Sequence, residues 1–271
     1  MTTFSYSQYS QYKRCAYSWY LARRLKVWQR PAAWLPQGTA VHEAAEEYEK
    51  SGRNMTLDDA LVVFADAYTR EVEKYTEDTP NLEYWFRSGP YGGADDVERR
   101  FGIGLGQVEK YLGWYDHHPE EVIWIAPDGT PGIEIGFDID LDGVQIRGYI
   151  DAVIQTDSGM AGDSDDGSPR PTLVVRDNKT GNKPGDDFQL AVYAVALQEQ
   201  FGVFVDTGDY WMGRTGKPTI PYDLSGWTRE RVAQEFRELR DNIEAERFEP
   251  DPEPSKCMFC DVATSCDFRA Q

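Results

Sequence analysis

The feature that most constrains the fold of this sequence is a change in its hydrophobic period after residue 118. Before that point apolar residues recur at helical spacing, and we expect helices over 8–27, after Pro36, after Thr56 and over 95–117. Beyond it, apolar and polar residues alternate as they do in strands, in the segments 121–127, 132–141, 144–156 and 172–180. The sequence therefore predicts a helical N-terminal region followed by a sheet.

Three further signals refine the expected architecture. Asp142-Gly143 is a hairpin signal between two of these strands. The last of the four strands is followed by a helix over 187–201, a strand within 202–213 and a helix over 227–247. This order predicts an α/β fold with a mixed central β-sheet flanked by helices. The G-x-G-x-G sequence at 102–106 has no strand before it, so we expect close helix packing there and not a dinucleotide-binding loop.

Charge and hydropathy limit the function classes. The 271 residues carry a net charge of −19, which argues against a non-specific coat on nucleic acid. Residues 1–42 nevertheless hold six basic residues and no acid, so either a phosphate binds there or the charges cluster by chance on a solvated helix. No segment approaches the ~20 apolar residues of a membrane helix, and the N-terminus lacks the features of a secretory signal. We expect a cytoplasmic protein with no membrane partner.

The four cysteines form an uneven pattern. Cys257, Cys260 and Cys266 lie close together in the tail with the spacing C-x2-C-x5-C, and Cys15 stands alone near the start. Disulfides are not expected without a secretory signal. Four reduced thiols, a four-thiolate zinc site and an iron–sulfur cluster remain, and the spacing favours a metal centre. Such a centre would join the first helix to the last segment, because metal-binding energy is also folding energy.

Acidic residues occur where the strands should be buried. Asp151 lies amid apolar residues of its strand, and an acid there is costly unless it binds a cation or is well hydrogen-bonded. Asp177 and Lys179 share one face of the next strand, because strand side chains repeat every two residues. A surface ion pair is the usual explanation of a lone D-x-K. A hard-cation site for phosphodiester hydrolysis is the alternative, with His42 on a nearby helix adding weight to it.

Six segments in this order resemble the PD-(D/E)xK nuclease superfamily, in its RecB-like branch that includes CRISPR-associated iron–sulfur exonucleases. The segments are "SYSQYSQYKRCAYSWYLAR", "GTAVHEAAEEY" for G-x-x-x-H, "GYIDAVI" for G-x-x-D, "VVRDNKTG" for D-x-K, "QLAVYA" for Q-x-x-x-Y, and "FEPDPEPSKCMFCDVATSC" for the terminal cysteines. They span nearly the whole chain. One departure is Asn178, which stands between the acid and the lysine where the family often has an apolar or aromatic residue.

The resemblance implies a restriction-endonuclease-like core and a role for each matching residue. It implies Mg²⁺ or Mn²⁺ ligands, namely His42, Asp151, Asp177 and the backbone carbonyl of Asn178. It implies catalysis by Asp151, Asp177 and Lys179, and substrate contact or bracing of the site by Gln189 and Tyr193. It also implies a [4Fe–4S] cluster on Cys15, Cys257, Cys260 and Cys266.

The function implied is a metal-dependent DNA nuclease, an exonuclease on single-stranded DNA ends, with recombination or replication proteins as partners. One nuclease domain would span 1–271, with a helical region at 1–118, a catalytic sheet at 119–247 and the cluster segment at 248–271. The alternative is a non-catalytic scaffold of nuclease fold in a recombination, replication or spacer-acquisition complex. No Walker-type G-x-x-x-x-G-K-[ST] sequence is present, so a helicase is excluded.

Overall fold

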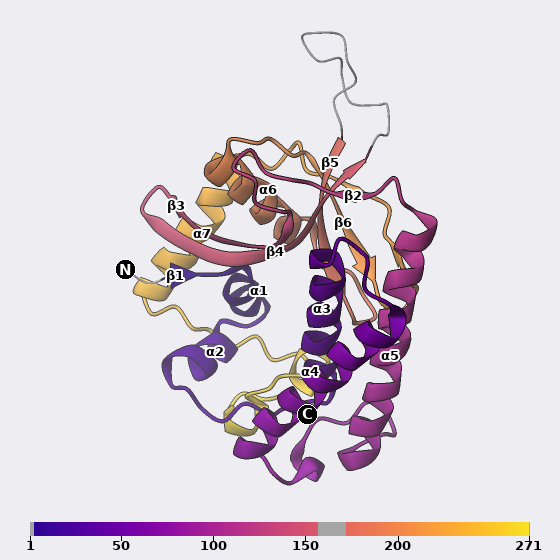
Figure 1. Ribbon diagram of the computed structural model, residues 1–271. Coiled ribbons are helices and arrows are strands. Elements are labelled where there is room, and N and C mark those ends of the chain that lie inside the picture. Colours follow the sequence, from indigo (N-terminus) through magenta and orange to yellow (C-terminus); the bar gives the residue numbers. More distant parts are fainter. Residues whose placement is uncertain (1–2, 157–171, 271) are drawn as a thin grey trace.

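A computed structural model describes residues 3–156 and 172–270 (Figure 1). Its strands form one mixed sheet in the order β1-β4-β5-β6-β7, with β2 and β3 also paired to β4 and β8 paired to β6. The strands are β1 (Thr3–Phe4), β2 (Val122–Ile123), β3 (Ile133–Leu141), β4 (Val144–Thr156), β5 (Thr172–Lys179), β6 (Thr207–Met212), β7 (Lys217–Pro218) and β8 (Tyr222–Asp223).

Strand β4 is the long centre of the sheet and determines where the acids lie. A two-residue turn joins it to β3, with positive φ at Asp142 (55°) and Gly143 (84°), which confirms the predicted hairpin. Along its other edge β4 pairs first with β1 and then, from Ala152 onward, with β5. Asp151 therefore lies just before the first paired residue of β4 and β5.

Helices cover both faces of the sheet (Figure 1). On one side α6 (Asp187–Phe201) and α7 (Arg229–Glu244) pack into the larger apolar core. On the other side α3 (Trp34–Lys50), α4 (Leu57–Asp78) and α5 (Gly93–His117) form a second core. Helix α6 joins β5 to its parallel neighbour β6, and its residues from Phe188 to Leu197 are all buried. The predicted fold class, a mixed sheet flanked by helices, is confirmed.

Two local predictions about the helical region are also confirmed. Helix α4 begins after Thr56, whose hydroxyl accepts a hydrogen bond from the backbone N–H of Asp59. Gly104 in α5 lies against the Phe64 ring of α4, and a Cβ at position 104 would come within 2.2 Å of that ring. Within the described residues, no helix combines the length and the apolar character needed to cross a membrane.

The predicted helix over 8–27 is wrong in one respect, because it is broken at Cys15. Residues Tyr6–Arg14 form α1, Ala16–Trp19 form α2, and Tyr20–Arg24 form the π-helical turn η1. Cys15 itself is extended, with φ −166° and ψ 107°. The periodic pattern gives no sign of this break. The break turns the Cys15 side chain toward the C-terminal tail, where the backbone N–H of Asp251 lies 3.5 Å from its sulfur.

The C-terminal tail packs against this broken helix (Figure 1). The tail contains α8 (Pro254–Met258) and the short 3-10 turn η3 (Ala263–Ser265). Another 3-10 turn, η2 (Leu82–Tyr84), lies outside the tail, between α4 and α5. Val262 is fully buried in a small cluster with Leu21 and Ala22. The backbone N–H of Arg30 donates to the carbonyl of Asp261 at 2.8 Å. The segment that follows Cys15 therefore packs against the tail that carries the other three cysteines.

Arg176 lies at the centre of a buried ion network on the α5 side of the sheet. Its guanidinium binds both carboxylate oxygens of Asp209, at 2.7 and 2.8 Å. It also lies 2.5 Å from Glu121 and donates to the Tyr115 hydroxyl at 3.1 Å. The network gives the buried Arg176 guanidinium two carboxylate partners, so it is not left as an unpaired charge in the interior.

Replacing Asp209 by alanine should lower the free energy of unfolding by about 3 kcal/mol, because the buried Arg176 would lose its two-point partner. Urea unfolding measures the change. Asp206→Ala, at an exposed acid of the adjoining loop, is the matched control. A loss no larger than that of the control would contradict a stabilising role for the network.

Candidate active site

The structure brings the predicted metal ligands from three elements to one end of the sheet. His42 comes from α3, Asp151 from β4 and Asp177 from β5. His42 Nδ1 lies 3.4 Å from Asp151 Oδ2 and 3.9 Å from Glu134 Oε1. One ligand atom from each of His42, Glu134 and Asp151 lies within 4.8 Å of the other two. This group has the residue types and the closeness to hold a cation.

Glu134 was not predicted, although the sequence contained a signal for it. Counting pairs back from the Asp142-Gly143 turn places Glu134 opposite Asp151, and the structure pairs Ile133 with Ala152 and Ile135 with Ile150 around that position. Glu134 has a left-handed backbone, with φ 44°, which is unusual for a residue with a side chain. The predicted hairpin therefore already placed a further acid opposite Asp151.

The charges of this group act strongly on one another. Burial by itself would lower the pKa of His42, but Asp151, Glu134 and Asp177 together raise it. Burial raises the pKa of Asp151, and the charges of Asp177 and Glu134 raise it further, against the opposing effect of His42. Three carboxylates around one imidazole leave an excess of negative charge, which a divalent cation would balance.

Asp177 lies beside this group and is held in place by three side chains. Its Oδ2 lies 2.7 Å from Lys179 Nζ. Its Oδ1 accepts from Gln189 Nε2 at 2.5 Å and from the Tyr193 hydroxyl at 3.0 Å. Lys179 in turn donates to Gln189 Oε1 at 3.0 Å. Side chains repeat along one face of β5, which explains why Asp177 and Lys179 meet.

Gln189 and Tyr193 lie one helical turn apart on α6 and are buried, with 8% and 6% of their surface exposed. Of the two roles predicted for them, the contacts favour bracing Asp177 over touching a substrate. Lys179 keeps 28% of its side chain exposed, so it can reach both Asp177 and a bound molecule.

The backbone of Asn178 also belongs to the site. Its N–H donates to Asp151 Oδ2 at 2.8 Å. In an extended strand, the N–H and C=O of one residue point toward the same neighbouring strand. The Asn178 carbonyl therefore faces the Asp151 side, and its role as a metal ligand stays a prediction.

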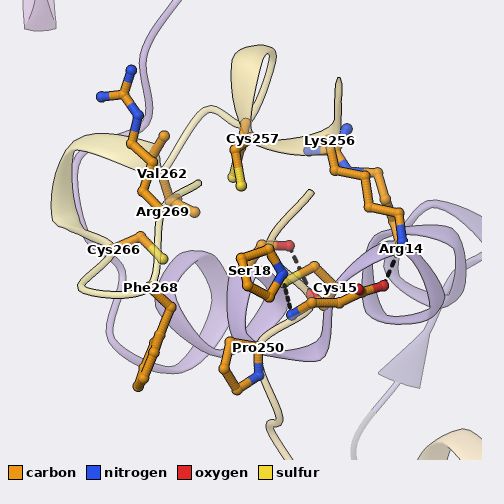
Figure 2. A pocket seen from close by; sticks show the side chains of 14 residues that line it. Arg14, Cys15, Ser18, Pro250, Lys256, Cys257, Val262, Cys266, Phe268 and Arg269 are labelled. Carbon is orange, nitrogen blue, oxygen red and sulfur yellow. Dashed lines mark hydrogen bonds and ion pairs between the residues drawn. The ribbon is translucent and has the colours of Figure 1, made fainter. Parts of the chain in front are cut away.

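The four cysteines line a single pocket between the first helices and the C-terminal tail (Figure 2). All four are half-buried free thiols, and Cys257 and Cys266 direct their sulfurs into the pocket (Figure 2). The charges of Cys15 and Cys257 help to raise the pKa of Cys266, after the effect of burial. Among the described residues, no three cysteine sulfurs lie within 4.8 Å of one another.

The chain is similar to several known proteins. The chain is 51% identical over 270 residues to the Gene 69 protein of Mycobacterium phage D29, covering 97% of this chain and 95% of that protein. It is 46% identical over 289 residues to the Gene 69 protein of Mycobacterium phage L5, with the same coverage. A crystal structure from Eubacterium rectale aligns with 99% of this chain and 90% of its own, at 11% identity and a TM-score of 0.44. The model of the PD-(D/E)XK nuclease superfamily matches residues 3–267, so the chain belongs to that superfamily.

Proposed function

We propose that this protein is a metal-dependent deoxyribonuclease that hydrolyses phosphodiester bonds as an exonuclease on single-stranded DNA ends. The observation that carries the proposal is the convergence of His42, Glu134 and Asp151 beside the Asp177–Lys179 pair. Membership of a nuclease superfamily makes hydrolysis the chemistry that best fits this group.

Mg²⁺ or Mn²⁺ fits the residues present. Carboxylate and carbonyl oxygens suit both ions, and the imidazole of His42 favours Mn²⁺. We assign the ligands to His42, Asp151, Asp177 and the Asn178 carbonyl, and add Glu134. When bound, a divalent ion polarises a phosphoryl oxygen and lowers the pKa of a bound water. Lys179 Nζ would orient that water or stabilise the negative charge that develops on the phosphate.

A single assay tests the proposal. The protein should release nucleotides from linear single-stranded DNA when Mn²⁺ or Mg²⁺ is added, and should leave covalently closed single-stranded circles intact. Cleavage of circles would show an endonuclease. Absence of any cleavage by the metal-loaded protein would favour the non-catalytic scaffold.

Tyr193 should act by positioning Asp177. Tyr193→Phe removes a hydrogen bond to Asp177 Oδ1 while keeping the ring, so affinity for Mn²⁺ should fall about tenfold. Calorimetric titration with Mn²⁺ measures this. Tyr149→Phe removes a hydroxyl from an exposed ring and is the control. Equal affinities in the two variants would argue against bracing.

We further propose that Cys15, Cys257, Cys260 and Cys266 bind a [4Fe–4S] cluster that ties the segment 248–271 to the first helices. The uneven spacing, C-x2-C-x5-C with a distant Cys15, favours an iron–sulfur cluster over zinc, whose sites usually consist of paired C-x2-C turns. The centre would be structural, because the cysteine pocket and the carboxylate group do not share residues.

A further inference from the structure

Three depressions of about 520, 800 and 540 Å³ join into one groove across the molecule. The first and second share Arg14, Trp34, Leu35 and Phe259. The second and third share Arg99, Arg100, Thr180 and Asn182. Helices α1, α3 and α5, the end of β5 and the cysteine tail therefore contribute to one continuous surface.

This groove passes one of the proposed catalytic residues, Lys179. Lys179 and Gln189 line its first part. Thr180, which follows Lys179 directly, lines the other two parts. Gly38, one helical turn before His42, lines the middle part. A chain molecule lying in the groove would run past Lys179.

The groove concentrates positive charge on an acidic protein. Its proximal wall, beside Lys179, consists of Arg14, Arg23 and Arg30. Its distal wall consists of Arg99, Arg100, Lys110 and Arg214. Among the described residues that line it, Asp261 is the only carboxylate. The chain as a whole carries −19, so this distribution cannot reflect average composition.

Most of these cations have no carboxylate partner. Five of them make no ion pair with a carboxylate in the described part of the chain: Arg14, Arg23, Arg30, Lys110 and Arg214. Arg99 and Arg100 share the single buried carboxylate of Asp96, at 3.1 and 3.7 Å, and so retain a net positive charge. A polyanion would find cations without a carboxylate partner along both walls.

Aromatic rings stand between the two walls. Trp34 stacks on Phe86 with 5.8 Å between ring centroids, and Phe259 of the cysteine tail lies 6.3 Å from Trp34. Phe259 is 53% exposed, although it lies in a cluster with two other rings. Exposed rings between cationic walls are the usual means of binding single-stranded nucleic acid, because unpaired bases stack on them while phosphates contact the cations.

We propose that this groove binds single-stranded DNA past Lys179, with phosphates on the proximal and distal walls and a base stacked on the exposed ring of Phe259. The inference deepens the proposed function by assigning the path of the substrate. It commits to a single strand, because a paired base in duplex DNA cannot offer its face to Phe259.

Separate measurements of DNA binding and DNA cleavage distinguish the groove assignment from the proposed hydrolysis. Fluorescence anisotropy of a labelled phosphorothioate oligothymidylate measures binding by the intact protein without hydrolysis. Lys110→Glu/Arg214→Glu should weaken binding at least about tenfold and reduce the slope of log affinity against log salt by about 1.4, or about 0.7 for each lost phosphate contact. Lys217→Glu, at an exposed lysine outside the groove, is the control for charge reversal.

Phe259→Ala should weaken binding about tenfold, whereas Phe204→Ala, at a ring 69% exposed elsewhere, should not. An abasic oligonucleotide should bind both variants equally, because it has no base to stack. Wild-type affinity in the Lys110/Arg214 variant, or equal affinity of the protein for duplex and single strands, would overturn the groove assignment. Normal binding without cleavage of ordinary DNA would overturn the proposed hydrolysis alone.

Discussion

Replacing Lys179 by methionine should lower the rate of single-strand cleavage about a thousandfold, the effect of removing one group that stabilises developing charge. Methionine keeps much of the length of lysine and loses only the ammonium. Asp177 would retain hydrogen bonds from Gln189 and Tyr193, so the carboxylate group should keep its arrangement. Initial rates with saturating Mn²⁺ on labelled linear single strands measure the effect.

Two control experiments show whether the effect is specific to the ammonium group of Lys179. Lys183→Met changes an exposed lysine four residues along and should leave the rate unchanged. Calorimetry with Mn²⁺ should show that Lys179→Met still binds the ion, which separates loss of catalysis from loss of metal. Cleavage by Lys179→Met at the wild-type rate would mean that the activity comes from a contaminant or from other residues.

Replacing Cys266 by alanine should remove the proposed cluster and destabilise the protein. The wild type should be brown when purified without oxygen, because iron–sulfur thiolate centres absorb visible light and zinc thiolates do not. The variant should lose this colour, its iron and its acid-labile sulfide. The melting temperature should fall by about 10 °C, because metal-site binding energy is also folding energy.

The control for this experiment is Ser265→Ala, which changes the exposed neighbouring residue and should keep both colour and stability. A colourless wild type that contains zinc would refute the cluster and leave the proposed hydrolysis intact, because the carboxylate group shares no residue with the cysteine pocket. A brown Cys266→Ala variant with full iron content would remove Cys266 from the set of ligands.

The position of the catalytic candidates could be predicted from the sequence because it depends on local periodicity. A repeat of two residues puts Asp177 and Lys179 on one face of β5, and a repeat of 3.6 puts Gln189 and Tyr193 on one face of α6. The two-residue turn at Asp142-Gly143 also implied the register that puts Glu134 opposite Asp151.

The break at Cys15 could not be predicted in this way. Apolar residues continue at helical spacing on both sides of it, and the extended backbone there is stabilised by packing of the tail, more than two hundred residues away in sequence. Strand β1 was missed for a similar reason, because two residues carry no periodicity and Thr3–Phe4 becomes a strand only by pairing with β4.

By itself, therefore, the sequence determined the order of the long strands and helices, the faces on which the acids and the lysine lie, and the family. These properties follow from spacing within single elements and between hairpin partners. Only the tertiary structure decided that Gln189 and Tyr193 bind Asp177, that the cysteines share a pocket, and that seven scattered cations line one groove together with Lys179. Those outcomes depend on contacts between distant segments, which packing of the whole chain selects and local spacing does not encode.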